Sequence, residues 1–279
     1  MWGPTPCQVA KLHCRTMSTG VIAVVSHFWP TRRKYLPEIV EAFHDQTVRP
    51  DDIVVWNNGP EPLEPMVGAT VINSTQNYGA RAKWVAAVAK PSPYYIMNDD
   101  DIKPRTRSIE HYLNYATPGC ALATHGMIMT NKRLSRGTDV NGNHIDKPVR
   151  VHAFNGCQQF TSIEAIGKMF AAEAAARCNI DDHKYLYNAD DILIAMVNDP
   201  ALVVPVTAEE CGYETVDREQ IESMNGELGY VAVRNMLAWR WWQQFKGKPL
   251  PGSSPIEQDK LDVYETNLAE RLSKRIFED

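Results

Sequence analysis

Alternating apolar and polar stretches divide the first hundred residues into strands and helices. Residues 21–26 form a continuous apolar run, which is typical of a strand buried on both faces of a sheet. Apolar residues at helical spacing predict helices over 35–43 and 78–90. Three more short strands are expected over 52–56, 70–73 and 94–97. The alternation predicts an α/β fold with a mixed, mostly parallel central sheet flanked by helices.

The order of elements becomes mixed beyond residue 100. Thr161 and Glu164 have the spacing of a capping box, which predicts a helix that ends at Arg177. Asn141 and Gly142 are a hairpin turn signal. Apolar runs predict strands over 122–130, 149–160 and 202–206. Further helices are expected over 190–197 and 227–246, and a loop over 207–226.

These elements predict one domain over residues 20–246. Residues 1–19 contain no long apolar stretch, and we expect a flexible N-terminal extension. Residues 247–279 combine a linker rich in proline, glycine and serine with an amphipathic helix. Heptad-like spacing does not decide whether that helix packs on the same domain or forms a homodimer.

Composition and charge exclude several classes of protein. Of the 279 residues, 44% are hydrophobic and 23% are charged, which is ordinary globular usage and excludes a disordered or collagen-like chain. A net charge of −5 argues against nucleic-acid binding over the whole surface. The sequence contains no signal peptide and no run of 18 apolar residues. We therefore expect a soluble, cytoplasmic protein without a membrane span. Its six cysteines form no CxxC pair, which favours free thiols over a zinc site.

Three acidic residues follow directly on the predicted strand 94–97. They are Asp99, Asp100 and Asp101, and in an open α/β sheet ligands bind beyond the carboxyl ends of the strands. Adjacent carboxylates repel one another unless a cation neutralises them, and a hard divalent cation prefers oxygen ligands. The cluster therefore indicates a metal site. The alternative is a solvated acidic turn.

Two predicted helix starts carry further candidate residues. Asp190 and Asp191 either complement a helix dipole or face a reacting hydroxyl. Asn77 and Arg81 begin the helix 78–90, where free backbone N–H groups bind anions. The alternative for this pair is plain capping, with Arg81 in solvent. Arg32 follows the first strand and is open to the same two interpretations.

Motifs of other enzyme classes are absent from the sequence. No GxGxxG follows the first strand, which counts against a dinucleotide site. A P-loop, a GxSxG elbow and an HExxH helix are also missing.

The order and spacing of the motifs resemble the exostosin-like glycosyltransferases, which have the GT-A fold and use nucleotide sugars. The matching segments are residues 52–58, 75–81, 96–101 and 188–192, and residues 156–160 are similar to the strand on the acceptor side of that family. The resemblance extends over about residues 21–245.

The resemblance implies a role for each group of residues. Asp101 and Asp99 would hold Mn²⁺ or Mg²⁺, and Asp191 or Asp190 would face the sugar C1 and the acceptor. The family's diphosphate-binding His-x-x-x-Arg segment is not plainly present, and Arg234 is its nearest substitute. The acceptor side would include Gly156 and Cys157. The donor would contact Ser26, His27, Phe28, Arg32, Asn57, Asn77, Arg81, Asp99 and Asp100.

The implied activity is metal-dependent transfer of a hexose or N-acetylhexosamine from a UDP-sugar to an acceptor hydroxyl, with retention of configuration. The acceptor would be a glycan, a glycoconjugate or another hydroxyl compound, including modified DNA if the chain is viral. Two alternatives remain open. A nucleotidyltransferase also uses strand-end carboxylates, but it needs a glycine-rich loop that this chain lacks. A non-catalytic nucleotide-sugar-binding module is the other, and the two intact acidic groups argue against it.

Overall fold

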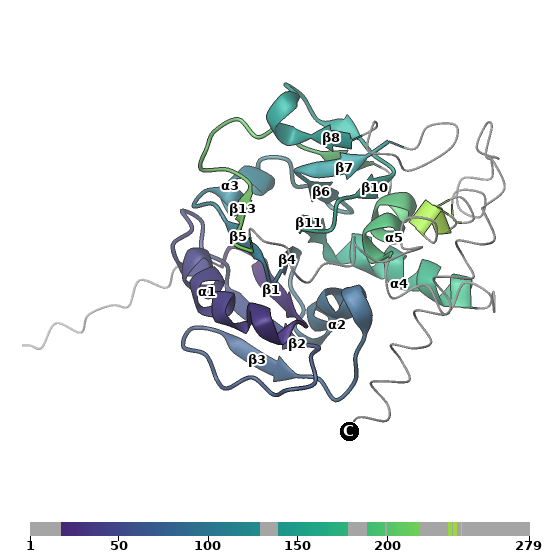
Figure 1. Ribbon diagram of the computed structural model, residues 1–279. Coiled ribbons are helices and arrows are strands. Elements are labelled where there is room, and N and C mark those ends of the chain that lie inside the picture. The colour runs from purple at the N-terminus through teal and green to yellow at the C-terminus, as the bar shows by residue number, and fades with distance from the viewer. Residues whose placement is uncertain are drawn as a thin grey trace, which may run out of the picture.

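The computed structural model describes residues 18–128, 139–177, 189–198 and 200–217, together with 234–235, 237–238 and 241. The main feature is an eight-stranded sheet with the order β3-β2-β1-β4-β11-β6-β12-β9 (Figure 1). Strands β11 and β9 run antiparallel to their neighbours, whereas the others share one direction. The predicted mixed, mostly parallel sheet flanked by helices is therefore confirmed.

The strands of this sheet are β1 (Val21–His27), β2 (Asp52–Asn57), β3 (Thr70–Asn73), β4 (Tyr94–Asp99), β6 (Ala121–Ala123), β9 (Val149–Arg150), β11 (Gln158–Ser162) and β12 (Ala201–Val203). Two smaller sheets combine β7 (His125–Met127) with β8 (Asp139–Asn141) and β10 (Ala153–Phe154), and β5 (Ile102–Pro104) with β13 (Tyr213–Thr215). The α-helices are α1 (Leu36–His44), α2 (Ala82–Ala89), α3 (Ser108–Leu113), α4 (Ile163–Arg177) and α5 (Asp190–Val197).

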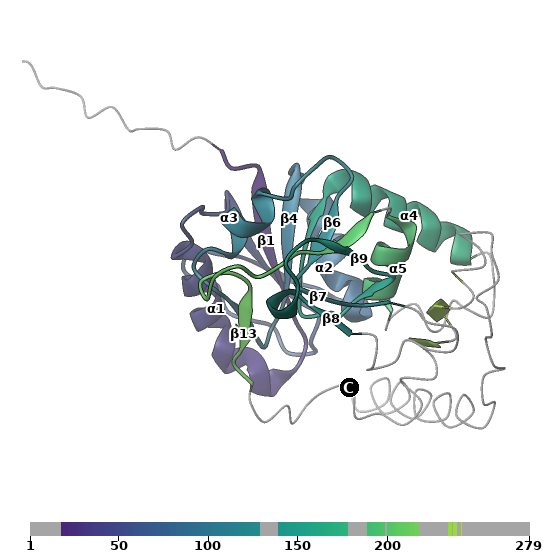
Figure 2. The same cartoon turned by 90° about the horizontal axis from the view of Figure 1, so that it is seen from above.

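The central sheet separates two hydrophobic cores. Successive side chains of a strand point to opposite faces, so Ile22 and Val24 of β1 pack with Trp84 of α2 and with helices α4 and α5. Val25 points the other way and packs with Leu36 of α1 and with α3. Figure 2 shows these two helical layers on either side of the sheet. Burial on both faces explains why β1 is a continuous apolar run.

The sequence prediction of the second half is wrong in several boundaries. Residues 122–130 do not form one strand, because the chain leaves the central sheet at Thr124 and continues as β7 in a smaller sheet. Residues 149–160 are divided among β9, β10 and β11, and β12 ends at Val203. The predicted loop 207–226 contains β13. Instead of a hairpin turn, Gly142 starts the 3-10 helix η4 (Gly142–His144), whose cap is Asn141.

Two helix starts also differ from the prediction. The hydroxyl of Ser162, rather than that of Thr161, accepts the N–H of Ala165 at 3.2 Å, because Thr161 still belongs to β11. The helix expected from residue 78 starts as the 3-10 helix η2 (Gly79–Arg81) and becomes α-helical only at Ala82. The equivalent helix after β1 starts with the 3-10 helix η1 (Pro30–Tyr35).

The segment directly before β1 is fixed to the sheet. The carboxylate of Asp51 accepts hydrogen bonds from Ser18, Thr19 and Gly20 at 2.7 to 3.1 Å. The extension predicted over residues 1–19 otherwise lies outside the described residues, as do the linker and helix predicted over 247–279. In the part of the chain that the structure describes, no helix is long and apolar enough to cross a membrane.

Candidate functional site

The acidic turn lies at the carboxyl end of the sheet's centre. Strand β1 lies between β2 and β4, and Ser26 of β1 is opposite Trp56 on one side and Asp99 on the other. His27 ends β1 and Asp99 ends β4, so the loop after β1 meets the turn formed by Asp100 and Asp101. The sheet topology therefore brings together residues that the sequence predicted as one site.

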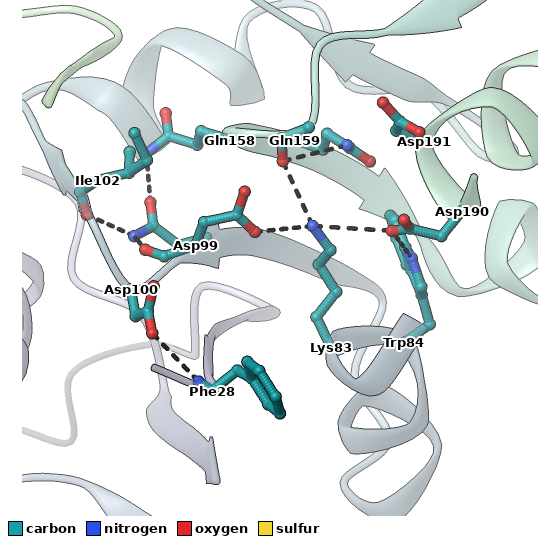
Figure 3. Close-up of polar contacts among 12 residues, drawn as sticks. Phe28, Lys83, Trp84, Asp99, Asp100, Ile102, Gln158, Gln159, Asp190 and Asp191 are labelled. Carbon is teal, nitrogen blue, oxygen red and sulfur yellow. Dashed lines mark hydrogen bonds and ion pairs between the residues drawn. The ribbon is translucent and has the colours of Figure 1, made fainter. Parts of the chain in front are cut away.

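Asp100 ties this turn to the loop after β1 by hydrogen bonds. Its Oδ2 lies 2.8 Å from Nδ1 of His27. The same oxygen accepts the backbone N–H of Phe28 at 3.1 Å (Figure 3). Its Oδ1 accepts a hydrogen bond of 3.1 Å from Arg32. The side chain is buried, with both oxygens engaged by the chain itself. The contacts of this predicted donor-binding residue are thus internal.

Arg32 neutralises the acidic turn from one side. Besides Asp100, its guanidinium contacts Oδ2 of Asp101 and Oδ2 of Asp217, both at 3.1 Å. Burial would lower the pKa of Arg32, but Asp101 and Asp100 outweigh burial and raise it. Burial raises the pKa of Asp101, and the Arg32 charge opposes that rise. One buried cation therefore holds three carboxylates together.

Lys83 neutralises the turn from the other side. Its Nζ lies 2.9 Å from Oδ1 of Asp99, 3.3 Å from the carbonyl oxygen of Gly156 and 3.7 Å from Oδ2 of Asp190. The residue is only 2% exposed. Burial would lower the pKa of Lys83, but Asp99 and Asp190 hold it above its usual range, so the ammonium keeps its proton. Figure 3 shows this lysine between the two carboxylates.

The two acids that begin α5 have different partners. Asp190 accepts a hydrogen bond of 2.8 Å from the indole Nε1 of Trp84, which directly follows Lys83 in α2. Asp191 is bound by both terminal nitrogens of Arg234, at 2.9 and 2.6 Å. Both carboxylates are buried. Arg234, predicted to meet the diphosphate, thus binds a carboxylate of the chain in this structure.

The carboxylates of Asp99 and Asp191 approach the same side of Gly156. A Cβ atom at Gly156 would lie 3.7 Å from Oδ2 of Asp99 and 3.9 Å from Oδ2 of Asp191. Both distances are ordinary van der Waals contacts, so the glycine leaves room for about one methyl group between the two acids. Gln159 is buried nearby, with its Nε2 3.5 Å from the Gly156 carbonyl oxygen. Its Oε1 has no hydrogen-bond partner in the described part of the chain.

The predicted acceptor-side cysteine borders the same place. Burial, together with the Asp99 and Asp101 charges, raises the pKa of Cys157 to about 12. The thiol is therefore protonated at neutral pH. Within the described residues Cys157 is free, as the sequence predicts.

The remaining predicted residues lie around this centre and are bound to the chain. Asn57 donates to the Glu61 carbonyl oxygen at 2.6 Å and to Asn73 at 2.8 Å, which holds the turn after β2. Asn77 accepts the N–H of Gly79 at 2.7 Å, although the N-cap of η2 is Tyr78. Arg81 forms an ion pair with Glu173 of α4. A small pocket between the loops after β1 and β2 is lined by His27, Phe28, Pro30, Arg33, Asn57, Gly59, Pro60, Glu61 and Leu63.

The residues assigned to a metal offer hard oxygen ligands. The ion pairs engage Oδ1 of Asp99 and Oδ2 of Asp101, which leaves a second oxygen on each carboxylate outside those pairs. Within the described residues no three His, Cys, Asp or Glu side chains form a ready-made metal cage. Mg²⁺ and its relatives bind nucleotides through one or two protein carboxylates plus phosphate oxygens, and the two acids suit that arrangement.

Comparison with known proteins gives matches to solved structures only. No family model and no curated protein matches the chain. Among the solved structures that match, the crystal structure of S. aureus TarS has 12% sequence identity and a TM-score of 0.47. The match covers 81% of this chain and 42% of that one, so this chain spans less than half of the TarS chain's length. Any function must therefore be argued from the chain's own residues.

Lys83, Trp84 and Asp217 are site residues that the sequence did not predict. One signal for Lys83 was present, because it lies in an otherwise apolar helical stretch over residues 82–89. A charged side chain within a buried helix needs a partner of opposite charge. Its partners follow the next strand and begin α5, so no local pattern could name them.

Proposed function

We propose that this chain is a glycosyltransferase that uses a nucleotide-sugar donor. The observation that supports the proposal is that the carboxylates of Asp99 and Asp191 approach the same position beside Gly156. One carboxylate ends a strand of the parallel part of the sheet, where ligands bind in α/β folds. The other belongs to a helix start across the site. Two carboxylates around one small space suit a sugar, whose hydroxyls are hydrogen-bond donors.

The nucleotide of the donor is proposed to occupy the pocket between the loops after β1 and β2. His27 and Phe28 offer ring surfaces there, and Asn57 lies at the end of β2. The base and ribose are expected to be those of UDP. The diphosphate would then point to the acidic turn. In this arrangement Ser26, opposite Asp99 on β1, lies beneath the bound donor.

Asp101 and Asp99 are the residues proposed to hold Mn²⁺ or Mg²⁺ with the donor. When bound, such an ion neutralises the charge that develops on the departing diphosphate. Arg32 already offsets part of the charge of the turn, through its contact with Asp101 at 3.1 Å.

The reaction exchanges one bond at the sugar C1. The bond from C1 to the diphosphate oxygen breaks, and its electron pair leaves with the nucleoside diphosphate. The acceptor oxygen forms the new bond. Asp191 orients the acceptor hydroxyl and stabilises the positive charge that develops at C1. Arg234 fixes the Asp191 carboxylate through two hydrogen bonds.

Retention of configuration, which the exostosin-like resemblance implies, sets the path of the proton. The acceptor then approaches on the face from which the diphosphate leaves, and its hydroxyl proton passes to the departing phosphate oxygen. Proton NMR of the product's anomeric signal tests this point. An inverted product would reject the exostosin-like resemblance and leave the transfer itself standing.

The test of the proposed function is product analysis with a panel of sugar nucleotides and Mn²⁺. We expect release of nucleoside diphosphate from at least one donor, through transfer or slow donor hydrolysis. Release of pyrophosphate would instead indicate a nucleotidyltransferase. Donor binding without either product would indicate a non-catalytic binding module. Adding glycans, glycoconjugates and hydroxylated nucleic acid to the active mixture then identifies the acceptor class.

A further inference from the structure

A single buried ammonium group joins the two halves of the proposed site. Lys83 belongs to α2, whereas its partners end β4, precede β11 and begin α5. Two of the three ammonium hydrogens are directed to Asp99 and to the Gly156 carbonyl oxygen, at 2.9 and 3.3 Å. The third direction is toward Asp190, at 3.7 Å.

The burial of this group has a direct consequence for its partners. The Lys83 side chain is 3% exposed, whereas the Asp99 side chain is 34% exposed. Oδ1 of Asp99 faces the lysine inside, so its Oδ2 faces the open place beside Gly156. A buried charge keeps its position only if its hydrogen-bond geometry is good, because the cost of desolvation is large. The lysine thereby fixes which oxygen of Asp99 faces outward.

The same group sets the position of the opposite carboxylates. Asp190 lies between the Lys83 ammonium and the indole of Trp84, at 3.7 and 2.8 Å. Because Asp191 is the next residue of α5, the place of Asp190 also determines where Asp191 lies. Lys83 therefore contributes, together with Trp84 and Arg234, to the distance between the two acids that face Gly156.

We propose that Lys83 is a positioning residue, which holds Asp99 and the start of α5 at the separation that the sugar requires. This inference rests on the proposed function. Lys83 touches neither the donor nor the acceptor, and acts through Asp99 and Asp190. The alternative is a lysine that only fills and stabilises the interior. The two roles predict different turnover in folded variants. If Lys83 is a positioning residue, a folded variant without the ammonium charge has a lower kcat. If Lys83 only stabilises the interior, the folded variant keeps the wild-type kcat.

The first experiment compares Lys83→Met and Lys83→Arg for nucleoside diphosphate release at a temperature where both are folded. We expect Lys83→Met to lose about 10²-fold in kcat, the scale of a misplaced catalytic group. Lys83→Arg keeps the charge and should recover at least about a tenth of wild-type kcat. The matched control is Lys90→Met, which removes the lysine at the C-cap of the same helix, where the side chain is 44% exposed and pairs with Asp52. Wild-type kcat in folded Lys83→Met, or equal losses in the Met and Arg variants, would overturn the proposal.

The second experiment needs no activity and separates this inference from the proposed function. It is a double-mutant cycle in thermal unfolding with Lys83→Met, Asp99→Asn and the double variant, with Lys83→Gln in place of Lys83→Met if that chain does not fold. Loss of the lysine leaves a carboxylate uncompensated and should lower Tm by about 6 °C or more. Asp99→Asn should restore part of that loss, because the unpaired charge is removed. Purely additive Tm changes would overturn the contact, even if wild-type protein releases no nucleoside diphosphate. A coupled cycle in an inactive wild-type protein would sustain the positioning contact and reject only the proposed function.

Discussion

The indole Nε1 of Trp84 donates a 2.8 Å hydrogen bond to Oδ2 of Asp190. This bond distinguishes two adjacent acids that are otherwise alike in sequence and burial. Asp190 is held from within by the indole and the nearby Lys83. Asp191 is held by Arg234 and faces the place beside Gly156. We therefore propose that Asp190 fixes the start of α5 and that Asp191 is the residue beside the reacting carbon.

Replacing Trp84 by phenylalanine should cost stability more than chemistry. Trp84→Phe leaves the Asp190 carboxylate without its indole donor, and a lost hydrogen bond to a buried charge costs about 1.5–3 kcal/mol. The smaller ring adds a cavity to that loss. We expect a lower free energy of unfolding in denaturant titrations, with donor affinity within about threefold of wild type. Unchanged stability would show that the indole does not support Asp190.

Removing the proposed metal ligand should weaken donor binding only when Mn²⁺ is present. Asp101→Asn removes a charged oxygen ligand, and we expect about a tenfold or larger rise in the UDP dissociation constant with Mn²⁺. Calorimetry with and without the metal measures the effect. Asp217→Asn is the matched control, because Arg32 also contacts Asp217 at 3.1 Å. If both substitutions raise the UDP dissociation constant equally, Asp101 acts through its ion pair with Arg32 and not as a metal ligand.

Arg81 is expected to contribute chiefly to stability. Its ion pair with Glu173 joins the start of α2 to α4, and the two side chains are 11% and 7% exposed. Arg81→Ala leaves Glu173 buried without this partner, and we expect a loss of about 3 kcal/mol in the free energy of unfolding. Glu173→Gln in the same chain should recover part of the loss. If Arg81→Ala has wild-type stability but binds the donor tenfold more weakly, Arg81 is a donor-binding residue, as its position in the sequence suggested.

The Cys157 thiol should react slowly, and its reactivity should rise with pH well beyond the usual range. Burial and the neighbouring Asp99 and Asp101 carboxylates raise its pKa to about 12. Only the thiolate reacts with iodoacetamide, so the rate should increase about tenfold for each pH unit between 8 and 10. Peptide mapping by mass spectrometry isolates this cysteine from the others. A rate that levels off near pH 8.5 would indicate an ordinary, accessible thiol.

The central strands could be predicted because burial on both faces makes them continuous apolar runs. Strands β1, β2 and β4 are of this kind, and their ends position the site. Strands β9 and β10 have two residues each, which is too short to show a period of alternation. The chain's change of sheet at Thr124 depends on pairing with β8 and β10, which no local pattern encodes.

The acidic residues of the site could be predicted, but their counter-ions could not. Asp99 and Asp191 stand out because a strand end and a helix start are recognisable in sequence. The sequence suggested that a metal offsets the acidic turn, whereas Arg32 and Lys83 already pair with it in the folded chain. These pairings join distant elements, so only the sheet order reveals them. For the same reason Asp217 was not expected at the site.

The measurement that tests the central claim most directly is turnover of Asp191→Asn with donor binding measured in parallel. The substitution preserves size and removes the charge that faces the place beside Gly156. We predict UDP affinity within about threefold of wild type, and a loss of about 10²-fold or more in nucleoside diphosphate release. Asp190→Asn, the neighbouring control, should lose less turnover than Asp191→Asn. Near-normal turnover in both variants would contradict the proposed catalytic role. The acids at the start of α5 would then only stabilise the helix.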